Sequence, residues 1–253
     1  MNFFVHKSVA ERYAKYRPYF HPLVIEKIKT YLRLQSPVRF AVDVGCGSGH
    51  STVALKEIAE LVAGLDISAE MLDFAVRKPG IQYMRSAAET LAIKSNSADL
   101  LTTSMAYHWF DPDQFFGEVR RVLRDGAWLI IFNNGCSGQM KRNPAFEEWF
   151  SQVYEERYPS PPRNAAPMTS EFAGQHGFDF SHQEDYQNEV EFTAEELAAY
   201  LITQSNVIAA AEHGHEEVED VYDWLVAQTR QFFKSGKATF PFSGFIWYLQ
   251  KAS

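Results

Sequence analysis

Short apolar runs alternate with amphipathic stretches through the first half of the chain. Runs of strand length fall at residues 40–44, 61–65, 81–84, 99–104 and 127–132. Between them, apolar residues recur at helical spacing within residues 51–60, after Ser68 and after Asp111. Strands that alternate with helices in this way are typical of βαβ units, so the pattern predicts an α/β fold with a parallel sheet.

Helix start signals agree with this pattern. Ser68 and Asp111 stand where an N-cap side chain would accept a backbone hydrogen bond, and Pro112 suits the first turn of the helix that follows. Thr193 is followed three residues later by Glu196, which predicts a capping box at the start of another helix.

The alternation breaks after residue 138. Several prolines surround one aromatic helix here, so we expect an insertion or lid. Farther on, the pattern predicts a strand at 187–192, a helix at 216–233 and a last strand at 244–249 that closes the sheet. We expect one domain over residues 1–253, with a helical cap at 1–35 and insertions at 138–175 and 194–233 that shape a substrate pocket.

Composition excludes several classes of protein. The chain has 253 residues, of which 46% are hydrophobic, which is enough for a full core and unlike a disordered chain. Two cysteines indicate a reducing compartment, and no apolar run is long enough for a membrane span. The first residues lack the layout of a signal peptide, so we expect a soluble cytoplasmic protein.

Charge argues against a nucleic-acid partner. The formal net charge is −8, from 24 basic and 32 acidic residues, and no basic cluster stands out. A nucleic-acid binder usually needs a basic face to displace counterions. Aromatic residues make up 15% of the chain, enough for some to line an apolar ligand pocket.

Three alternating glycines follow the first predicted strand in the segment VDVGCGSG. Gly45, Gly47 and Gly49 allow the backbone to approach a ligand closely, with free N–H groups of the next helix directed at it. A dinucleotide fingerprint would require glycine three residues after Gly47, where this chain has His50. The segment therefore predicts a nucleotide-like cofactor but departs from the dinucleotide pattern.

Asp66 ends the second predicted strand. A carboxylate at this point of a βαβ unit can accept both hydroxyl groups of an adenosine ribose. The alternative is an aspartate that caps a helix or is solvated. Its distance from the glycines is the one that a single βαβ step requires, which favours the ligand role.

Four segments in order resemble the motifs of class I S-adenosylmethionine-dependent methyltransferases: VDVGCGSG, GLDIS, RSAAETLAI and SADLLTTSMAYHWFD. With AERYAKYRPYF near the start, they look like the small-molecule branch that includes trans-aconitate methyltransferase. The resemblance implies a Rossmann-like sheet of seven strands, six parallel and the last antiparallel. It also implies S-adenosylmethionine as cofactor and methyl transfer to a small molecule.

The resemblance also implies roles for particular residues. Backbone at Gly45, Cys46, Gly47 and Gly49 would line the methionine part of the cofactor, with Asp43 behind it. Asp66 would hold the ribose, and Ile67 and Met71 would lie against the adenine. Ala87, Ala88 and Glu89 would border the adenine edge, although many relatives have aspartate at the position of Ala87. Ser104 would lie beside the methionine moiety.

Candidates for binding or activating the methyl acceptor are identified by their positions along the chain; we call them acceptor-side candidates. Tyr13 and Arg17 are four residues apart and share a helix face, either as a carboxylate-binding pair or as an ordinary surface pair. His108 follows the fourth strand and is the candidate general base, with a structural histidine as the alternative. Trp109 and Tyr200 are candidates to shape the substrate pocket, or simply pack.

The sequence gives less support to a metal site and to methylation of nucleic-acid bases. His213 and His215 precede two glutamates but lack a defined set of further ligands, so no metal site is predicted. The fourth strand is followed neither by Asn-Pro-Pro-Tyr nor by a cysteine, unlike enzymes that methylate nucleic-acid bases. Two alternatives to methyl transfer stay open: an NAD(P)-dependent oxidoreductase and a non-catalytic cofactor-binding module. The sequence does not choose among a carboxylate, a hydroxyl and an activated carbon as acceptor.

Overall fold

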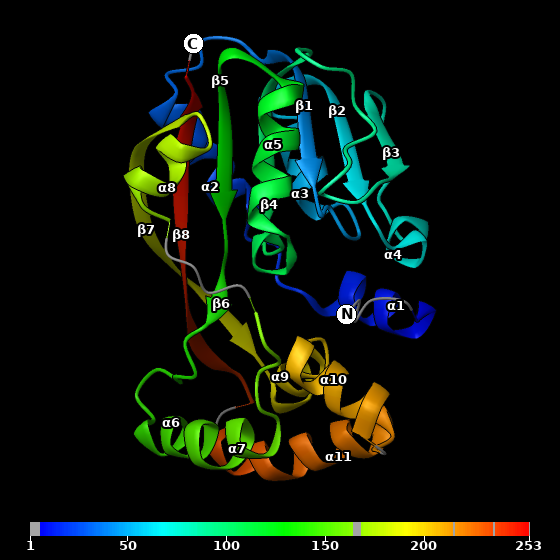
Figure 1. Ribbon diagram of the computed structural model, residues 1–253. Coiled ribbons are helices and arrows are strands. Elements are labelled where there is room, and N and C mark those ends of the chain that lie inside the picture. The colour runs from blue at the N-terminus through cyan, green and yellow to red at the C-terminus, as the bar shows by residue number, and fades with distance from the viewer. Residues whose placement is uncertain (1–5, 164–167, 215, 235, 253) are drawn as a thin grey trace. The chain divides into compact units, whose positions relative to one another are not determined.

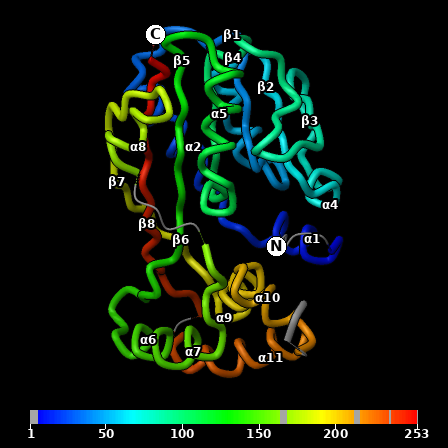
Figure 2. Tube along the Cα trace, in the orientation of Figure 1, coloured from blue at the N-terminus to red at the C-terminus, as the bar shows by residue number. Residues whose placement is uncertain are grey.

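The chain folds into two compact units, each made of several segments. The computed structural model describes residues 6–163, 168–214, 216–234 and 236–252, with residues 212–214 described by their backbone alone. The sheet unit comprises Tyr19–Asn133, Arg163–Asp185 and Phe245–Ser253, and the helical unit comprises Met1–Pro18, Asn134–Pro162 and Tyr186–Gly244. Figures 1 and 2 show the path of the chain through both.

The sheet unit holds five parallel strands. Their order is β3 (Ile81–Arg85), β2 (Ala59–Asp66), β1 (Val38–Val44), β4 (Ala98–Ser104) and β5 (Leu123–Phe132). The last strand, β8 (Ala238–Lys251), pairs antiparallel with β5, as predicted. Strand β7 (Phe178–Phe192) also pairs with β8. The predicted seven-stranded methyltransferase-like sheet is confirmed, with a two-residue strand β6 (Gly135–Cys136) as an addition.

Helices and loops connect these strands at the predicted places. The helices of the sheet unit are α2 (His21–Tyr31), α3 (His50–Leu55), α4 (Ala69–Asp73), α5 (Pro112–Val122) and α8 (Ser170–Gln175). The Ser68 side chain accepts from the Met71 N–H, and Asp111 caps α5 by accepting from the Gln114 N–H. Both predicted N-caps are therefore confirmed.

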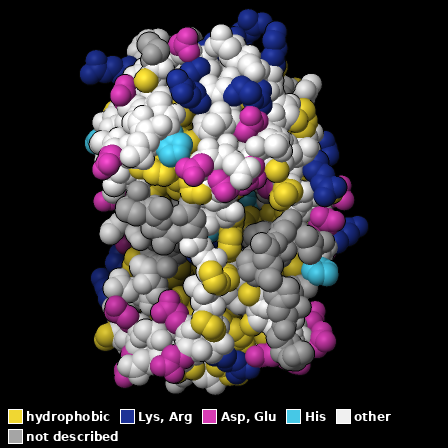
Figure 3. Space-filling model, viewed as in Figure 1, with side chains coloured by type: hydrophobic (Ala, Val, Ile, Leu, Met, Phe, Trp, Pro, Cys, Tyr) yellow, Lys and Arg dark blue, Asp and Glu magenta, His cyan; other side chains and the backbone are white. Residues whose placement is uncertain are grey.

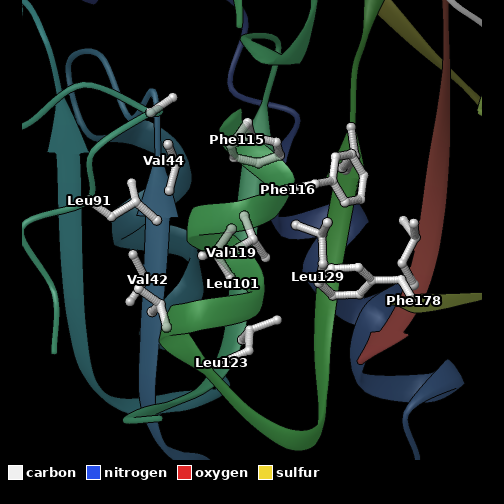
Figure 4. Close-up of a cluster of buried hydrophobic side chains, with 14 of the residues drawn as sticks. Val42, Val44, Leu91, Leu101, Phe115, Phe116, Val119, Leu123, Leu129 and Phe178 are labelled. Atoms are coloured by element: carbon white, nitrogen blue, oxygen red, sulfur yellow. The ribbon is translucent and has the colours of Figure 1, made fainter. Parts of the chain in front are cut away.

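The core of the sheet unit forms where α5 packs on the strands. Phe115, Phe116 and Val119 of this helix are fully buried against side chains such as Leu101 and Leu129. Figure 4 shows these side chains interdigitating, with Phe178 of β7 beside them. Burial of this cluster fixes the strands whose ends carry the candidate site.

The helical unit has a separate core. Its helices are α1 (Lys7–Tyr16), α6 (Pro144–Trp149), α7 (Glu155–Arg157), α9 (Ala194–Leu201), α10 (Ser205–Gly214) and α11 (Val218–Thr229). A π-helical turn at Phe150–Tyr154 joins α6 to α7, and a 3-10 turn at Arg230–Phe232 follows α11. Buried aromatic side chains, including Phe146, Tyr158 and Tyr200, dominate this core. The predicted capping box at Thr193 and Glu196 is present.

Several boundaries differ from the sequence expectations. The helix expected at 51–60 ends at Leu55, because β2 already begins at Ala59. Among the apolar residues at helical spacing after Ser68, Val76 is 41% exposed, because α4 ends before it at Asp73. Of the described residues in the expected insertion, 138–162 belong to the helical unit, and Arg163 and residues 168–175 belong to the sheet unit.

Surface and membrane features are consistent with the composition. On the face drawn in Figure 3, lysines and arginines are interspersed with acidic side chains. Among the described residues, no helix combines the length and the apolar character that a bilayer span needs.

Candidate functional site

The glycine loop leaves the end of β1 in a left-handed backbone conformation. Gly45, Gly47 and Gly49 have φ of 68°, 53° and 80°. Glycine is required at Gly49, because an added Cβ would lie 2.3 Å from the Tyr83 hydroxyl oxygen in addition to the unfavourable φ. Gly49 is also the N-cap of α3. The loop is therefore a fixed turn that brings backbone N–H groups to the edge of the sheet.

The Asp43 carboxylate links the helix that follows the glycine loop to the sheet through hydrogen bonds. Its carboxylate is fully buried and accepts hydrogen bonds from Ser51 and Thr52 of α3, each at 2.6 Å, and from Thr102 of β4 at 3.0 Å. Burial raises the Asp43 pKa to about 6, while the three hydroxyl groups lower it in part. Asp43 therefore holds α3, β1 and β4 together, and it has no exposed surface for a ligand.

Asp66 lies at the end of β2 and bridges two loops. One carboxylate oxygen accepts the Gly47 N–H at 2.8 Å and the other accepts the Ser68 N–H at 2.8 Å. Burial raises the Asp66 pKa, and these backbone hydrogen bonds oppose the rise. The Ile67 N–H also lowers the pKa of this carboxylate. A carboxylate has about four acceptor positions, so a donor such as a ribose hydroxyl can still be accepted.

The neighbours of Asp66 offer an apolar surface. The Ile67 side chain is 51% exposed, whereas Met71 is buried at 3%. The segment after β3 lies at the same sheet edge, where the arrowheads of β1, β2 and β3 end (Figure 1). There Ala88 is buried, and Glu89 accepts the Asp111 N–H at 3.1 Å. An exposed isoleucine beside a carboxylate with spare lone pairs suits an adenosine group.

The end of β4 adds polar and aromatic groups. Ser104 is buried, and its hydroxyl lies 3.4 Å from Nε2 of His21. The next residue, Met105, has a φ of 59°, a conformation that few side chains other than glycine adopt. His108 and Trp109 follow in a 3-10 turn with ring centroids 4.7 Å apart, and the Arg163 guanidinium lies over the Trp109 ring.

His21 is a site candidate that the sequence analysis missed. It is 7% exposed, and its Nδ1 is buried without a hydrogen-bond partner. The ring stacks on Phe20 at 4.2 Å and lies 6.2 Å from the His50 ring. Burial, and to a smaller extent the neighbouring His50, lowers the His21 pKa to about 3. No motif marks this residue, because only the folded chain brings the start of α2 to the end of β4.

The remaining acceptor-side candidates lie together in the helical unit. The Arg17 guanidinium is 4.6 Å from the centre of the Tyr13 ring and 5.5 Å from that of Tyr200. Its Nη2 donates to the Thr203 carbonyl oxygen at 2.7 Å. The cofactor candidates and His108 belong to the sheet unit, so the predicted residues form two groups, one in each unit.

The predicted absence of a metal site stays a prediction. His215 lies outside the described residues, as does the side chain of His213. Glu216 forms an ion pair with Arg157 at 2.7 Å. Among the residues that the structure describes, no three histidine, cysteine or acidic side chains are grouped closely enough for a metal ion.

Comparison with known proteins agrees with the sheet and the loop. Residues 42–131 match the family described as a methyltransferase domain. A candidate methyltransferase of Dictyostelium discoideum is 30% identical over 159 residues, 62% of this chain and 60% of that protein. An uncharacterized methyltransferase of Mycobacterium tuberculosis is 32% identical over 128 residues, 50% and 51% of the two chains. The chain thus spans between half and two thirds of these relatives.

A solved structure extends the likeness to the whole fold. A candidate type II methyltransferase from Anaeromyxobacter dehalogenans superposes with a TM-score of 0.69 at 22% identity, covering 93% of this chain and 97% of that one. At this identity the likeness shows the fold alone. The domain match includes the glycine loop, Asp66 and the β4 end, where the geometry suits an adenosine group. Over residues 42–131 the chain is therefore similar to a methyltransferase domain, and it shares its fold with a solved structure named as a methyltransferase.

Proposed function

We propose that this protein transfers a methyl group from S-adenosylmethionine to a small-molecule acceptor. One observation carries the proposal: Asp66 accepts the Gly47 N–H and so joins the glycine loop to the ribose position at the end of β2. When bound, S-adenosylmethionine supplies a methyl group already activated on a sulfonium. The chain has to hold the two reactants in line and exclude water.

Each cofactor-side residue has a proposed task. Backbone groups of Gly45, Cys46, Gly47 and Gly49 line the methionine part, and Ser104 lies beside it. Asp66 accepts the ribose hydroxyls. Ile67 and Met71 pack on the adenine, and Ala87, Ala88 and Glu89 border its edge. Asp43 acts indirectly, because its three hydroxyl partners hold the loop in place.

The acceptor-side tasks depend on the acceptor. A carboxylate needs no general base, whereas a hydroxyl or an activated carbon must lose a proton. His108 is the proposed base for the latter case. Tyr13, Arg17, Trp109 and Tyr200 are the proposed substrate-binding residues. The insertions at 138–175 and 194–233 are proposed to shape the substrate pocket, and residues 1–35 are proposed as a helical cap of a single methyltransferase domain.

A turnover assay tests the proposal. The full chain is incubated with methyl-labelled S-adenosylmethionine and a panel of carboxylates, alcohols and activated carbon acids, and formation of S-adenosylhomocysteine is followed. We expect turnover with at least one acceptor class. Binding of S-adenosylhomocysteine without turnover on any of them would favour the non-catalytic module instead.

His108→Ala separates the two acceptor chemistries. If the acceptor must lose a proton, the variant keeps its affinity for S-adenosylhomocysteine and loses roughly 100-fold or more in kcat. Unchanged turnover would remove His108 as the base.

A further inference from the structure

The start of helix α2 lies against the end of strand β4, inside the sheet unit. His21 is the first residue of α2 and Ser104 is the last residue of β4, and Ser104 Oγ lies 3.4 Å from His21 Nε2. Both side chains are buried, with exposed fractions of 7% and 8%. The separation is long for a hydrogen bond, and hydrogen bonds at binding sites commonly shorten when the ligand binds. We call these two residues the His21–Ser104 pair.

The His21–Ser104 pair lies beside the glycine loop. Strands β1 and β4 are parallel neighbours in which Asp43 pairs with Thr102. Gly45 and Ser104, each two residues farther on, therefore stand at the same edge of the sheet. A Cβ added at Gly45 would lie 2.5 Å from the Ala106 Cβ, so the loop and the segment after β4 are in direct contact. The pair thus borders the position proposed for the methionine part of the cofactor.

The surroundings of His21 keep its ring neutral. The ring stacks on Phe20 at 4.2 Å, and the Phe132 ring lies edge-on at 6.3 Å. Burial among these rings and, to a smaller extent, the neighbouring His50 lower the His21 pKa to about 3. A positive charge is also unfavourable at the N-terminus of a helix, where His21 stands. A neutral imidazole carries one proton, on either Nδ1 or Nε2.

The environment of Nδ1 decides which nitrogen carries the proton. Among the described residues, this buried atom of His21 has no hydrogen-bond partner. A buried N–H group without an acceptor is rarer in proteins than a buried acceptor without a donor. The proton therefore belongs on Nε2, which donates to Ser104 Oγ. Within the described part of the chain the His21 ring is the one partner of this hydroxyl, so the Ser104 proton itself is left for another acceptor.

We propose that the Ser104 hydroxyl donates a hydrogen bond to the carboxylate of the cofactor's methionine part and that His21 is the positioning residue that directs this hydroxyl. The inference rests on the proposed function and adds to it a residue that no sequence motif marks. In the methionine part, the ammonium group only donates hydrogen bonds and the sulfonium accepts none. The carboxylate oxygens are therefore the acceptors that suit a hydroxyl proton, and a charged acceptor makes the hydrogen bond stronger.

Two ligands that differ only in this carboxylate test the contact. The full chain is titrated calorimetrically with S-adenosylhomocysteine and with its decarboxylated analogue. We expect Ser104→Ala to weaken binding of S-adenosylhomocysteine about 10-fold and to change binding of the analogue by less than about 2-fold. Thr103→Val is the matched control and should keep both affinities. It removes a buried hydroxyl of the same strand that has no hydrogen-bond partner among the described residues and faces the other side of the sheet.

Variants of His21 test its positioning role. His21→Leu should weaken binding of S-adenosylhomocysteine several-fold and leave the analogue unchanged, whereas His21→Gln, whose amide N–H can replace Nε2–H, should restore most of the affinity. In the Ser104→Ala background, His21→Leu should have no further effect, because the two residues act through one hydrogen bond. Nitrogen NMR of the histidine-labelled chain should place the proton on Nε2, with the His21 signal identified by its loss in His21→Gln.

Four results would overturn the proposal. The first is a proton on Nδ1 of His21, and the second is unchanged affinity of Ser104→Ala for S-adenosylhomocysteine. The third is simple addition of the effects of Ser104→Ala and His21→Leu. The fourth is equal weakening of the two ligands, which with a lower melting temperature would mean a structural role for the pair. Failure of the proposed function reads out separately, because the unmodified chain would then bind neither ligand.

Discussion

The Asp66 carboxylate accepts two backbone hydrogen bonds, so a substitution at this position also changes these bonds. Replacement by alanine removes the acceptors of the Gly47 and Ser68 N–H groups together with the proposed ribose contacts. We expect Asp66→Ala to weaken S-adenosylhomocysteine binding about 100-fold, since hydrogen bonds to a charged group contribute roughly 1.5–3 kcal/mol each. Asp66→Asn keeps one acceptor oxygen and should lose less. Equal affinity of Asp66→Ala and wild type in calorimetry would remove Asp66 from the site.

His21 should give the protein an acid-sensitive stability. Its folded-state pKa of about 3 lies below the ordinary 6.5. Between these two pH values, His21 is therefore protonated in the unfolded chain and neutral in the folded chain. The free energy of unfolding therefore falls as pH drops from 6.5 towards 3, by about 1.4 kcal/mol per pH unit from this residue. His21→Asn should remove that slope in urea unfolding measured at several pH values.

Comparing the pH dependence of the free energy of unfolding between variants separates the contribution of His21 from those of other titratable groups. Asp43 works in the opposite direction, because its folded-state pKa of about 6 exceeds 3.8 and the folded state gains stability as pH falls across that window. His50, whose pKa burial lowers, acts in the same direction as His21. His182→Asn, at an exposed position, is the control. An acid limb of the same slope in His21→Asn and wild type would contradict this assignment.

At the scale of elements, glycines at two positions should respond oppositely to alanine. Gly49→Ala places a Cβ 2.3 Å from the Tyr83 oxygen at a φ of 80° and should destabilise the fold by about 2 kcal/mol or more. Gly117 lies in α5, where a Cβ would meet nothing within 4 Å. Gly117→Ala should stabilise by about 0.5–1 kcal/mol. Urea unfolding checks both, and opposite signs are required.

Local signals were sufficient to predict most elements of the sheet unit. The N-caps Ser68 and Asp111 act within three residues of themselves, so tertiary context does not change them. The elements that were not predicted lack a local sequence signal and form through contacts with distant parts of the chain. Strand β7 runs from Phe178 to Phe192, but its first half, DFSHQEDY, is polar and gave no strand signal. The helix over Ser205–Gly214 has a mixed alanine-rich sequence and was not predicted.

The candidate site was predictable only where a motif is contiguous. The glycine loop and Asp66 fall within one βαβ unit, whose spacing the fold fixes. His21 and Ser104 are 83 residues apart, and Arg17 and Thr203 are 186 apart. No spacing rule links such pairs, because their proximity comes from packing of whole elements.

For the whole molecule, two separate cores imply a local response to cofactor. The proposed cofactor residues lie in the sheet unit, while the helical unit has its own buried cluster. We expect S-adenosylhomocysteine to slow amide hydrogen exchange at residues 45–50, 66–71 and 86–89 and to leave α6 near its free rate. Uniform slowing along the chain would contradict a site localised at these strand ends.

The central claim is the identity of the cofactor, and a parallel titration tests it most directly. The full chain is titrated calorimetrically with S-adenosylmethionine, S-adenosylhomocysteine, NAD and NADP. The account predicts binding of the two methionine-derived compounds and no binding of the dinucleotides. Binding of a dinucleotide alone would contradict it and support the oxidoreductase alternative.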